Sequence, residues 1–443
     1  MFLKLWDMSY RRLGDMVKFI SNKNTDGNAT VLFGINIDKF FMPSVANIIG
    51  VDLKKYKVVK KHQFACNRMH VGRDERLPIS MSTFDYDFIV SPAYDVFEVI
   101  TSDVLPEYLM LWFRRKEFDR QCWFYTDADV RGGLHLDALK SIEIKVPSIE
   151  EQRQIVEQYQ SVANKIKVNE QICEKLEATA QALYKHWFVD FEFPVGHCEE
   201  SGTNDKAIPA LVAEERSLYA TKQKGYKSSG GKMVWNEELG KEIPEGWEVG
   251  TIGDLVNTQY GFTDIANPSK GTAKFLRITD VVGNYIRWDD VPYCSIPVGD
   301  ISKYALEFGD FVISRTGANV GYGKMIGKYA PLSVFASFLV RLKPKSVEFI
   351  SYLYCLIISK VYKDFVKTNS EGSAQPQANA NILTKMNCLL ASTEVYAEFN
   401  KEILPIIDFK EILGLQNQEL TQLQSLLLSR LAVGEEEKRK IMV

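Results

Sequence analysis

Two long segments of the chain carry hydrophobic residues at alternating steps of three and four, which is the spacing of an apolar stripe along an α-helix. The first segment predicts one long helix over 148–193. Ser148 is followed three residues later by Glu151, a capping box that indicates where this helix begins. The stripe keeps a heptad pattern that favours pairing with another helix, and its members are Ile155, Tyr159, Val162, Ile166, Asn169, Cys173, Leu176, Ala180, Leu183 and Trp187.

The second segment predicts a helix over 391–434, in which Pro405 is expected to introduce a kink or a restart. Asn169 and Asn417 occupy similar places in the two stripes. A polar residue there can fix how two helices pair, and a solvated edge of the stripe is an equally good interpretation. We expect the two segments to form an antiparallel coiled coil. The second stripe consists of Phe399, Ile403, Ile406, Leu413, Leu420, Leu427 and Leu431, with Lys410, Asn417 and Gln424 as interruptions.

An internal repeat organises the rest of the chain. Residues 13–17 (LGDMV) return as 252–256 (IGDLV), and residues 64–68 (FACNR) return as 311–315 (FVISR). Further matches join 108–112 to 352–356 and 139–142 to 383–386, in the same order, which indicates duplication. Short β-rich runs alternate with helical stretches inside each copy. The sequence therefore predicts two mixed α/β domains, at 1–147 and 244–390, each followed by a long helix.

Polar and Gly/Ser-rich residues between the copies predict a linker over 194–243, with one short amphipathic helix near 210–220. Residues 435–443 are expected to form a charged tail. The seven cysteines are odd in number and lack Cys-x-x-Cys spacing, which suits buried thiols in a reducing compartment. Since no apolar run reaches membrane-spanning length and the N-terminus lacks a signal-peptide pattern, we expect a cytoplasmic protein without a membrane partner.

The sequence offers little support for an enzyme or a metal site. The glycine cluster 317–324 fails as a P-loop because Ala318 and Met325 stand where Gly and Ser or Thr are needed. It also fails as a dinucleotide fingerprint, because Ile326 takes the place of the third glycine. The five histidines do not lie at metal-ligand spacing, so we expect no metal and no catalytic residue in this chain.

Two polar loops remain as candidate sites. Their glycines permit close backbone approach, hydroxyl groups can bind phosphates, and Arg or Asn can contact base edges in a major groove. The net charge of −3 counts mildly against a nucleic-acid binder, and a solvated polar turn is an equally good interpretation of each loop. We expect DNA contacts from Lys60, Lys61, Asn67, Arg68, His70, Arg73 and Arg76 in the first copy, and from Arg277, Ser314, Arg315, Thr316, Gly317, Asn319, Tyr322, Lys324, Gln375 and Gln377 in the second.

Several segments together resemble the DNA specificity subunits of type I restriction-modification systems. The segments are 243–249 (IPEGWEV), 308–321 (FGDFVISRTGANVG), 147–155 (PSIEEQRQI) and 183–191 (LYKHWFVDF), and the resemblance covers nearly the whole chain. The first copy departs from it, because NRMHVGR at 67–73 replaces the glycine-rich loop.

The resemblance implies an α+β fold in which two mixed α/β target recognition domains are separated by two long antiparallel helices. Each domain would bind one half of a split, asymmetric DNA site, and the helices would fix the unread spacer. The expected partners are double-stranded DNA, two methyltransferase subunits and restriction/translocase subunits. S-adenosylmethionine, ATP and Mg would belong to those subunits, with no cofactor in this chain. Three alternatives remain open: a specificity subunit of another restriction class, a coiled-coil scaffold that binds protein, and an enzyme whose active site the sequence does not reveal.

Overall fold

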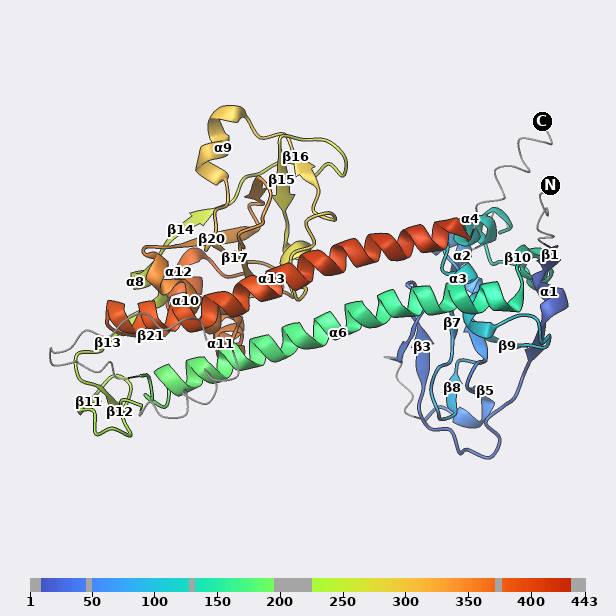
Figure 1. The fold of residues 1–443 in the computed structure, drawn as a ribbon, viewed down its shortest axis with the longest axis horizontal. Helices are drawn as coiled ribbons and strands as arrows, with labels where there is room; N and C mark the ends of the chain where they lie inside the picture. The colour runs from blue at the N-terminus through green and yellow to red at the C-terminus, as the bar shows by residue number, and fades with distance from the viewer. Residues whose placement is uncertain (1–8, 45–49, 127–131, 195–224, 371–376, 432–443) are drawn as a thin grey trace, which may run out of the picture. The chain divides into compact units, whose positions relative to one another are not determined.

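The computed structural model describes residues 9–44, 50–126, 132–194, 225–370 and 377–431. The chain divides into two compact units, and the long helices contribute to both. The first unit comprises Met1–Ile166 and Leu420–Val443, and the second comprises Lys167–Glu419. Figure 1 shows α6 (Ile149–Phe188) in green and α13 (Thr393–Arg430) in red, each as one continuous helix.

The first unit is a mixed domain of short strands and helices that leads into α6. In chain order its elements are β1 (Ser9–Arg12), α1 (Leu13–Met16), β2 (Val17–Ile20), β3 (Phe33–Ile35), β4 (Phe41–Pro43), η1 (Leu53–Lys55), β5 (Lys57–Val59), β6 (Phe64–Cys66), η2 (Arg68–His70), α2 (Val71–Asp74), β7 (Ile79–Met81), β8 (Phe88–Val90), β9 (Asp95–Val99), α3 (Pro106–Phe113), α4 (Lys116–Phe124), α5 (Leu136–Ser141) and β10 (Glu143–Val146).

The second unit has a similar order of elements and leads into α13. They are β11 (Met233–Asn236), β12 (Lys241–Pro244), β13 (Glu248–Thr251), α8 (Ile252–Leu255), β14 (Val256–Tyr260), β15 (Ala273–Leu276), η4 (Ile278–Val281), β16 (Tyr293–Cys294), α9 (Val298–Tyr304), β17 (Phe311–Ser314), β18 (Gly323–Met325), β19 (Ser333–Phe335), β20 (Leu339–Pro344), η5 (Val347–Phe349), α10 (Ile350–Ile358), α11 (Lys360–Ser370), α12 (Ala380–Thr384) and β21 (Asn387–Leu390).

The two domains share the topology of their four-stranded sheet. A four-stranded sheet has the order β2-β9-β6-β7 in the first unit and β14-β20-β17-β18 in the second. A separate antiparallel pair joins the strands that flank each repeat, β1 with β10 and β13 with β21. Every strand of one sheet therefore has a counterpart at the same place in the other. The duplication inferred from the sequence is confirmed, and so is the mixed fold class.

Equivalent tyrosines anchor the two cores to equivalent strands, through hydrogen bonds of opposite direction. Tyr108 of α3 donates a hydrogen bond of 2.8 Å to the backbone oxygen of Lys145 in β10. Tyr352 of α10 accepts one of 3.0 Å from the backbone nitrogen of Leu389 in β21. Both rings are buried, and a buried tyrosine needs a partner for its hydroxyl. Each helix is thereby fixed against the last strand before the long helix.

The start of α6 follows the predicted capping box. Glu151 accepts hydrogen bonds from the backbone nitrogen and the hydroxyl of Ser148 at 3.0 and 2.8 Å, and Ser148 Oγ accepts one from the nitrogen of Glu151 at 3.4 Å. Such a cap satisfies two otherwise unpaired donors and stabilises a helix by about 1 kcal/mol. The sequence of α6 contains neither Gly nor Pro, so its 40 residues continue without a break.

Within the second unit, α6 and α13 pair antiparallel. Asn169 contacts Asn417, Glu177 contacts Lys410, and the Trp187 ring lies 5.2 Å from that of Phe399, so residue numbers fall along α13 as they rise along α6. Within the first unit, Ile155, Val156 and Tyr159 of α6 and Leu428 and Leu431 from the α13 end join one hydrophobic core. The predicted pairing of the two helices is confirmed inside each unit.

Aromatic residues at the end of α6 tie the helix pair to the second domain. The Phe188 ring lies 4.7 Å from Tyr352 and 5.0 Å from Phe399. Trp187 and Phe188 are almost wholly buried in the largest core cluster. Burial of each such side chain contributes about 2–3 kcal/mol, so the position of α6 against this domain is strongly specified.

The structure differs from the sequence expectations in two places. The antiparallel hairpin β11–β12 lies where a linker was expected, and α13 continues through Pro405 without a restart. The helix expected near 210–220 and the tail 435–443 lie outside the described residues. Among the helices that the structure describes, none is long and apolar enough to cross a membrane.

Candidate nucleic-acid interface

The candidate loop of the second domain connects β17 to β18. Two backbone hydrogen bonds close it, from Ser314 to the Tyr322 oxygen at 2.8 Å and from Gly321 to the Ser314 oxygen at 2.9 Å. Gly317 and Gly321 have φ values of +76° and +82°, which disfavour other residues. The glycines that resembled a phosphate loop therefore serve the turn itself. Thr316 lies just before Gly317, and Asn319 lies between the two glycines.

A second segment lies against this loop, as an isolated bridge joins Thr316 to Gln377. The Ala378 nitrogen donates a hydrogen bond of 2.8 Å to the Arg315 oxygen. The structure thus brings Gln377 beside the predicted loop residues, although 60 positions separate them in the chain. Gln375 lies outside the described residues.

Aromatic side chains that the sequence analysis missed surround the loop. The Arg315 guanidinium lies 5.1 Å from the centre of the Tyr260 ring, and the Lys363 ammonium lies 5.2 Å from that of Tyr322. Tyr260 and Phe338 are 44% and 57% exposed. Cations over exposed rings are held in place yet accessible, an arrangement suited to contacts with phosphates and bases. Exposure of an aromatic residue leaves no signal in the sequence, which is why these positions were not predicted.

In the first domain, the candidate loop connects β6 to β7 through η2 and α2. Asn67 caps η2, with its side-chain oxygen accepting from the Met69 nitrogen at 3.1 Å. Arg68 donates to Asp95 and to the Leu134 oxygen, both at 2.5 Å. The side chain of His70 is outside the described part of the structure.

The remaining predicted cations of the first domain each have an acidic neighbour. Arg73 pairs with Asp74 at 2.7 Å and Arg76 with Asp38 at 3.3 Å. Lys60 and Lys61, in the turn before β6, lie 3.9 Å from Asp87 and 2.5 Å from Asp85. These side chains are exposed, and exposed ion pairs contribute only about 0–1 kcal/mol, so they can exchange the carboxylate for a phosphate.

Three predicted residues of the second domain lie apart from the exposed face of the loop. Ser314 is fully buried, and its hydroxyl donates to the Thr316 oxygen at 3.3 Å. Arg277 binds Asp280 at 3.0 Å at the start of η4. Lys324 lies on β18 and lines a pocket formed with α6 and α13, where its ammonium donates to the Asn284 oxygen at 3.4 Å.

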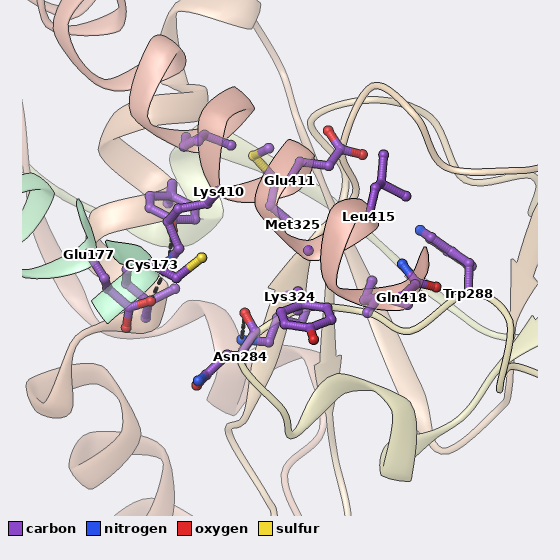
Figure 2. Close-up of a pocket in the computed structure, with 17 residues that line it drawn as sticks. Cys173, Glu177, Asn284, Trp288, Lys324, Met325, Lys410, Glu411, Leu415 and Gln418 are labelled. Carbon is purple, nitrogen blue, oxygen red and sulfur yellow. Dashed lines mark hydrogen bonds and ion pairs between the residues drawn. The ribbon is translucent and has the colours of Figure 1, made fainter. Parts of the chain in front are cut away.

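Figure 2 shows this pocket, in which an ion pair joins the two long helices. Lys410 donates to Glu177 at 2.5 Å and to the Tyr354 hydroxyl at 2.9 Å. Burial opposes ionisation of Glu177, but the charge and hydrogen bond of Lys410 outweigh it and lower the pKa of the carboxyl group. For Lys324, burial and the nearby charge of Lys410 lower the pKa to about 8. The pocket therefore holds a paired lysine and a second lysine whose ammonium group loses its proton at lower pH than an ordinary lysine.

Cysteines and carboxylates of the described residues do not form a metal-binding cluster. No group of three or more possible metal ligands occurs in the described ranges. The six described cysteines are buried. Burial raises the pKa of the Cys294 thiol to about 11 and that of Cys388 to about 12, so these thiols are not activated nucleophiles.

The chain is similar to known proteins along most of its length. A sequence model described as the type I restriction modification DNA specificity domain matches residues 6–178 and 244–424. The type I restriction enzyme HindI specificity subunit of Haemophilus influenzae is 27% identical over 479 residues, which cover 96% of this chain and 98% of that protein. The type I restriction enzyme MjaIX specificity subunit of Methanocaldococcus jannaschii is 29% identical over 163 residues, covering 36% of this chain and 29% of that protein.

One solved structure has the same fold across nearly the whole chain. The S subunit of a type I restriction-modification system from M. genitalium gives a TM-score of 0.50 at 12% identity and covers 97% of both chains. The family match falls in two copies, one on each domain with most of its long helix, and these are the copies that the sheet topology relates. With two matched domains that span most of its length, the chain belongs to the family of type I restriction-modification DNA specificity subunits.

Proposed function

We propose that this chain recognises a bipartite, asymmetric DNA site, with one half-site bound by each domain, and that it catalyses no reaction itself. The observation that carries this proposal is the duplicated domain with an equivalent loop in each copy. In both copies the loop leaves the third strand of the four-stranded sheet, β6 or β17, and returns in the next. Two similar loops with different side chains suit two half-sites of different sequence.

We assign the DNA contacts of the second domain to Arg315, Thr316, Asn319, Tyr322 and Gln377, with Tyr260 and Lys363 beside them. In the first domain we assign them to the exposed cations Lys60, Lys61, Arg73 and Arg76 together with Asn67. The side chains assigned to these contacts carry a net positive charge, although the whole chain has a net charge of −3. Affinity should therefore fall steeply with added salt, as bound cations replace the counterions of DNA.

The two long helices act, in this proposal, as the spacer that sets the number of unread base pairs between the half-sites. Their pairing is specific, because it includes a polar contact and an ion pair besides apolar residues. Two methyltransferase subunits and the restriction/translocase subunits supply the chemistry. S-adenosylmethionine, ATP and Mg bind to those subunits, and an adenine of the site is flipped into the methyltransferase pocket.

The test is the methylation pattern of DNA from cells that contain the methyltransferase partner with or without this chain. We expect one split motif of methylated adenines that appears only with this chain. Purified chain and partner should bind that motif in a mobility-shift assay with a strong dependence on salt. A pattern independent of this chain, or salt-insensitive binding of a protein in place of DNA, contradicts the proposal and favours the scaffold alternative.

A further inference from the structure

We propose that equivalent arginines in the two domains have different tasks: Arg315 binds a guanine in the half-site of the second domain, whereas Arg68 is an internal clamp of the first domain and contacts no base. This inference rests on the proposed function, and it adds which base class is recognised and by which domain. The family match does not distinguish the two positions.

Arg68 and Arg315 are equivalent by the pairing of their strands. Before them, Phe64 and Phe311 hold matching positions in β6 and β17, where each pairs with the neighbouring strand β9 or β20. After them, the Arg68 oxygen accepts from the Leu134 nitrogen at 3.0 Å, as the Arg315 oxygen does from Ala378 at 2.8 Å. Both arginines therefore leave the sheet at the same point and are held by the same backbone contact.

The neighbouring strand provides different partners at this point. In the first domain Cys66 pairs with Asp95, and in the second Ile313 pairs with Val340. Asp95 binds Arg68 at 2.5 Å, with the two side chains only 20% and 22% exposed. Val340 is fully buried and has no acceptor to offer. One change in the strand thus decides whether the arginine is bound internally.

Arg68 is occupied on two sides. Its Nε binds Asp95 and its Nη1 binds the Leu134 oxygen. Breaking a partly buried ion pair from one side costs more than the pair itself contributes, because a charge remains without its partner. To reach a base, Arg68 would have to leave Asp95 in this state. The residue therefore fastens the segment at Leu134 to the sheet.

Arg315, by contrast, packs against an aromatic ring and forms no ion pair among the described residues. Its guanidinium lies over the Tyr260 ring, and the Tyr260 hydroxyl accepts from the Ala380 nitrogen at 3.1 Å, which fixes the ring. Among the described residues no carboxylate lies within ion-pairing distance of Arg315. Five planar donors remain for a ligand, and little conformational freedom is lost when one binds.

Guanine is the base that fits these donors. Its O6 and N7 present two acceptors side by side in the major groove, and an arginine fork binds both. Phosphate oxygens offer similar chemistry but occur at every nucleotide. The two ligands are distinguished by specificity: loss of a base contact changes the preferred sequence, whereas loss of a phosphate contact weakens binding to all sequences alike.

The experiment selects DNA from a random library with the assembled methyltransferase complex that contains this chain, in wild-type form and with Arg315→Ala. We expect wild type to require guanine at one position of one half-site. With Arg315→Ala the preference at that position should fall by about 10- to 100-fold, with the other half-site unchanged. Lys360→Ala, which removes an exposed charge at the start of α11, is the matched control and should leave every base preference intact.

The role of Arg68 is tested with Arg68→Met and with the double variant Arg68→Met/Asp95→Val. The second change places valine where the second domain has Val340. Both should select the wild-type motif, and the double variant should recover stability that the single variant loses. If Arg68→Met does not fold, the double variant still answers the question.

Three outcomes overturn the inference: a wild-type motif without guanine in the affected half-site, uniform weakening by Arg315→Ala, or an altered base preference in the Arg68 variants. Failure of the proposed function looks different, because the wild-type complex would then select no split motif at all.

Discussion

Asn169 of α6 donates a hydrogen bond of 2.8 Å from Nδ2 to Oδ1 of Asn417 in α13, between two side chains that are fully buried. The same amide group donates to the Gln416 side chain at 2.8 Å. The two interruptions seen in the heptad stripes are therefore partners. The sequence left open whether these asparagines pair the helices or lie at a solvated edge of the stripe. The structure shows that they pair the helices and are buried. An apolar stripe tolerates sliding, whereas this hydrogen bond forms in one alignment only.

Replacement of Asn417 by Leu should destabilise the second unit by about 1–3 kcal/mol, because Asn169 keeps a buried amide with fewer partners. The double variant Asn169→Leu/Asn417→Leu should recover that stability. Denaturant unfolding of the two variants and the wild type gives the comparison.

The same double variant also tests the spacer proposal. If the asparagine pair selects the alignment of the helices, its loss should broaden the spacer length in the methylation motif while both half-sites stay the same. A single unchanged spacer length would show that other contacts, such as the one between Glu177 and Lys410, fix the alignment.

Lys410→Met should destabilise the second unit by a few kcal/mol, since Glu177 would keep its charge in a half-buried pocket without its partner. The double variant Lys410→Met/Glu177→Gln should restore most of the loss. Thermal unfolding of the single and double variants measures the coupling between the two residues. Additive effects would contradict a direct pair.

Lys324 makes the stability of the second unit depend on pH. Burial and the charge of Lys410 hold its pKa at about 8, below the ordinary value of 10.5. Between these two values the unfolded chain binds more protons than the folded chain, so this group makes the free energy of unfolding rise with pH through that window. Below about pH 8 both states are protonated, so the full cost of burying the charged ammonium lowers the free energy of unfolding there.

The variant Lys324→Met should lack this rise and should be more stable than wild type near pH 7, by on the order of 1–2 kcal/mol. Buried thiols and tyrosines with raised pKa values act in the opposite direction. The quantity to measure is therefore the difference between wild type and variant at pH 7 and at pH 9.5. A difference that does not shrink toward the higher pH would refute the argument.

Much of the fold was predictable because its signals are local or periodic. The capping box of Ser148 and Glu151 marked the start of α6, and the stripe of threes and fours predicted its length and its pairing. The repeat was visible because residues 13–17 and 252–256 form equivalent short helices, each of which leads into the first strand of the four-stranded sheet of its own domain. These features depend on side chains whose partners lie within a few residues or recur at a fixed step.

The site was less predictable because its contacts cross the sheet. Asp95 binds Arg68 from the neighbouring strand, and no spacing in the sequence announces that contact. Lys324 was expected in the loop, yet it lies on β18. Side chains along a strand point to alternate faces of the sheet. The sequence alone does not say which face of so short a strand is turned toward the loop. The direction of a side chain was the missing information in both cases.

The core of the first unit is built from two segments that lie far apart in the sequence, so it cannot be completed early in synthesis. Leu428 and Leu431 complete a core that otherwise comes from residues 13–159. The ribosome makes the earlier part first, so the apolar residues of this core that pack against Leu428 and Leu431 stay uncovered until α13 emerges. An exposed patch of this kind favours aggregation. Chains that end before α13 should therefore self-associate, and only a fully translated polypeptide can close its own first domain.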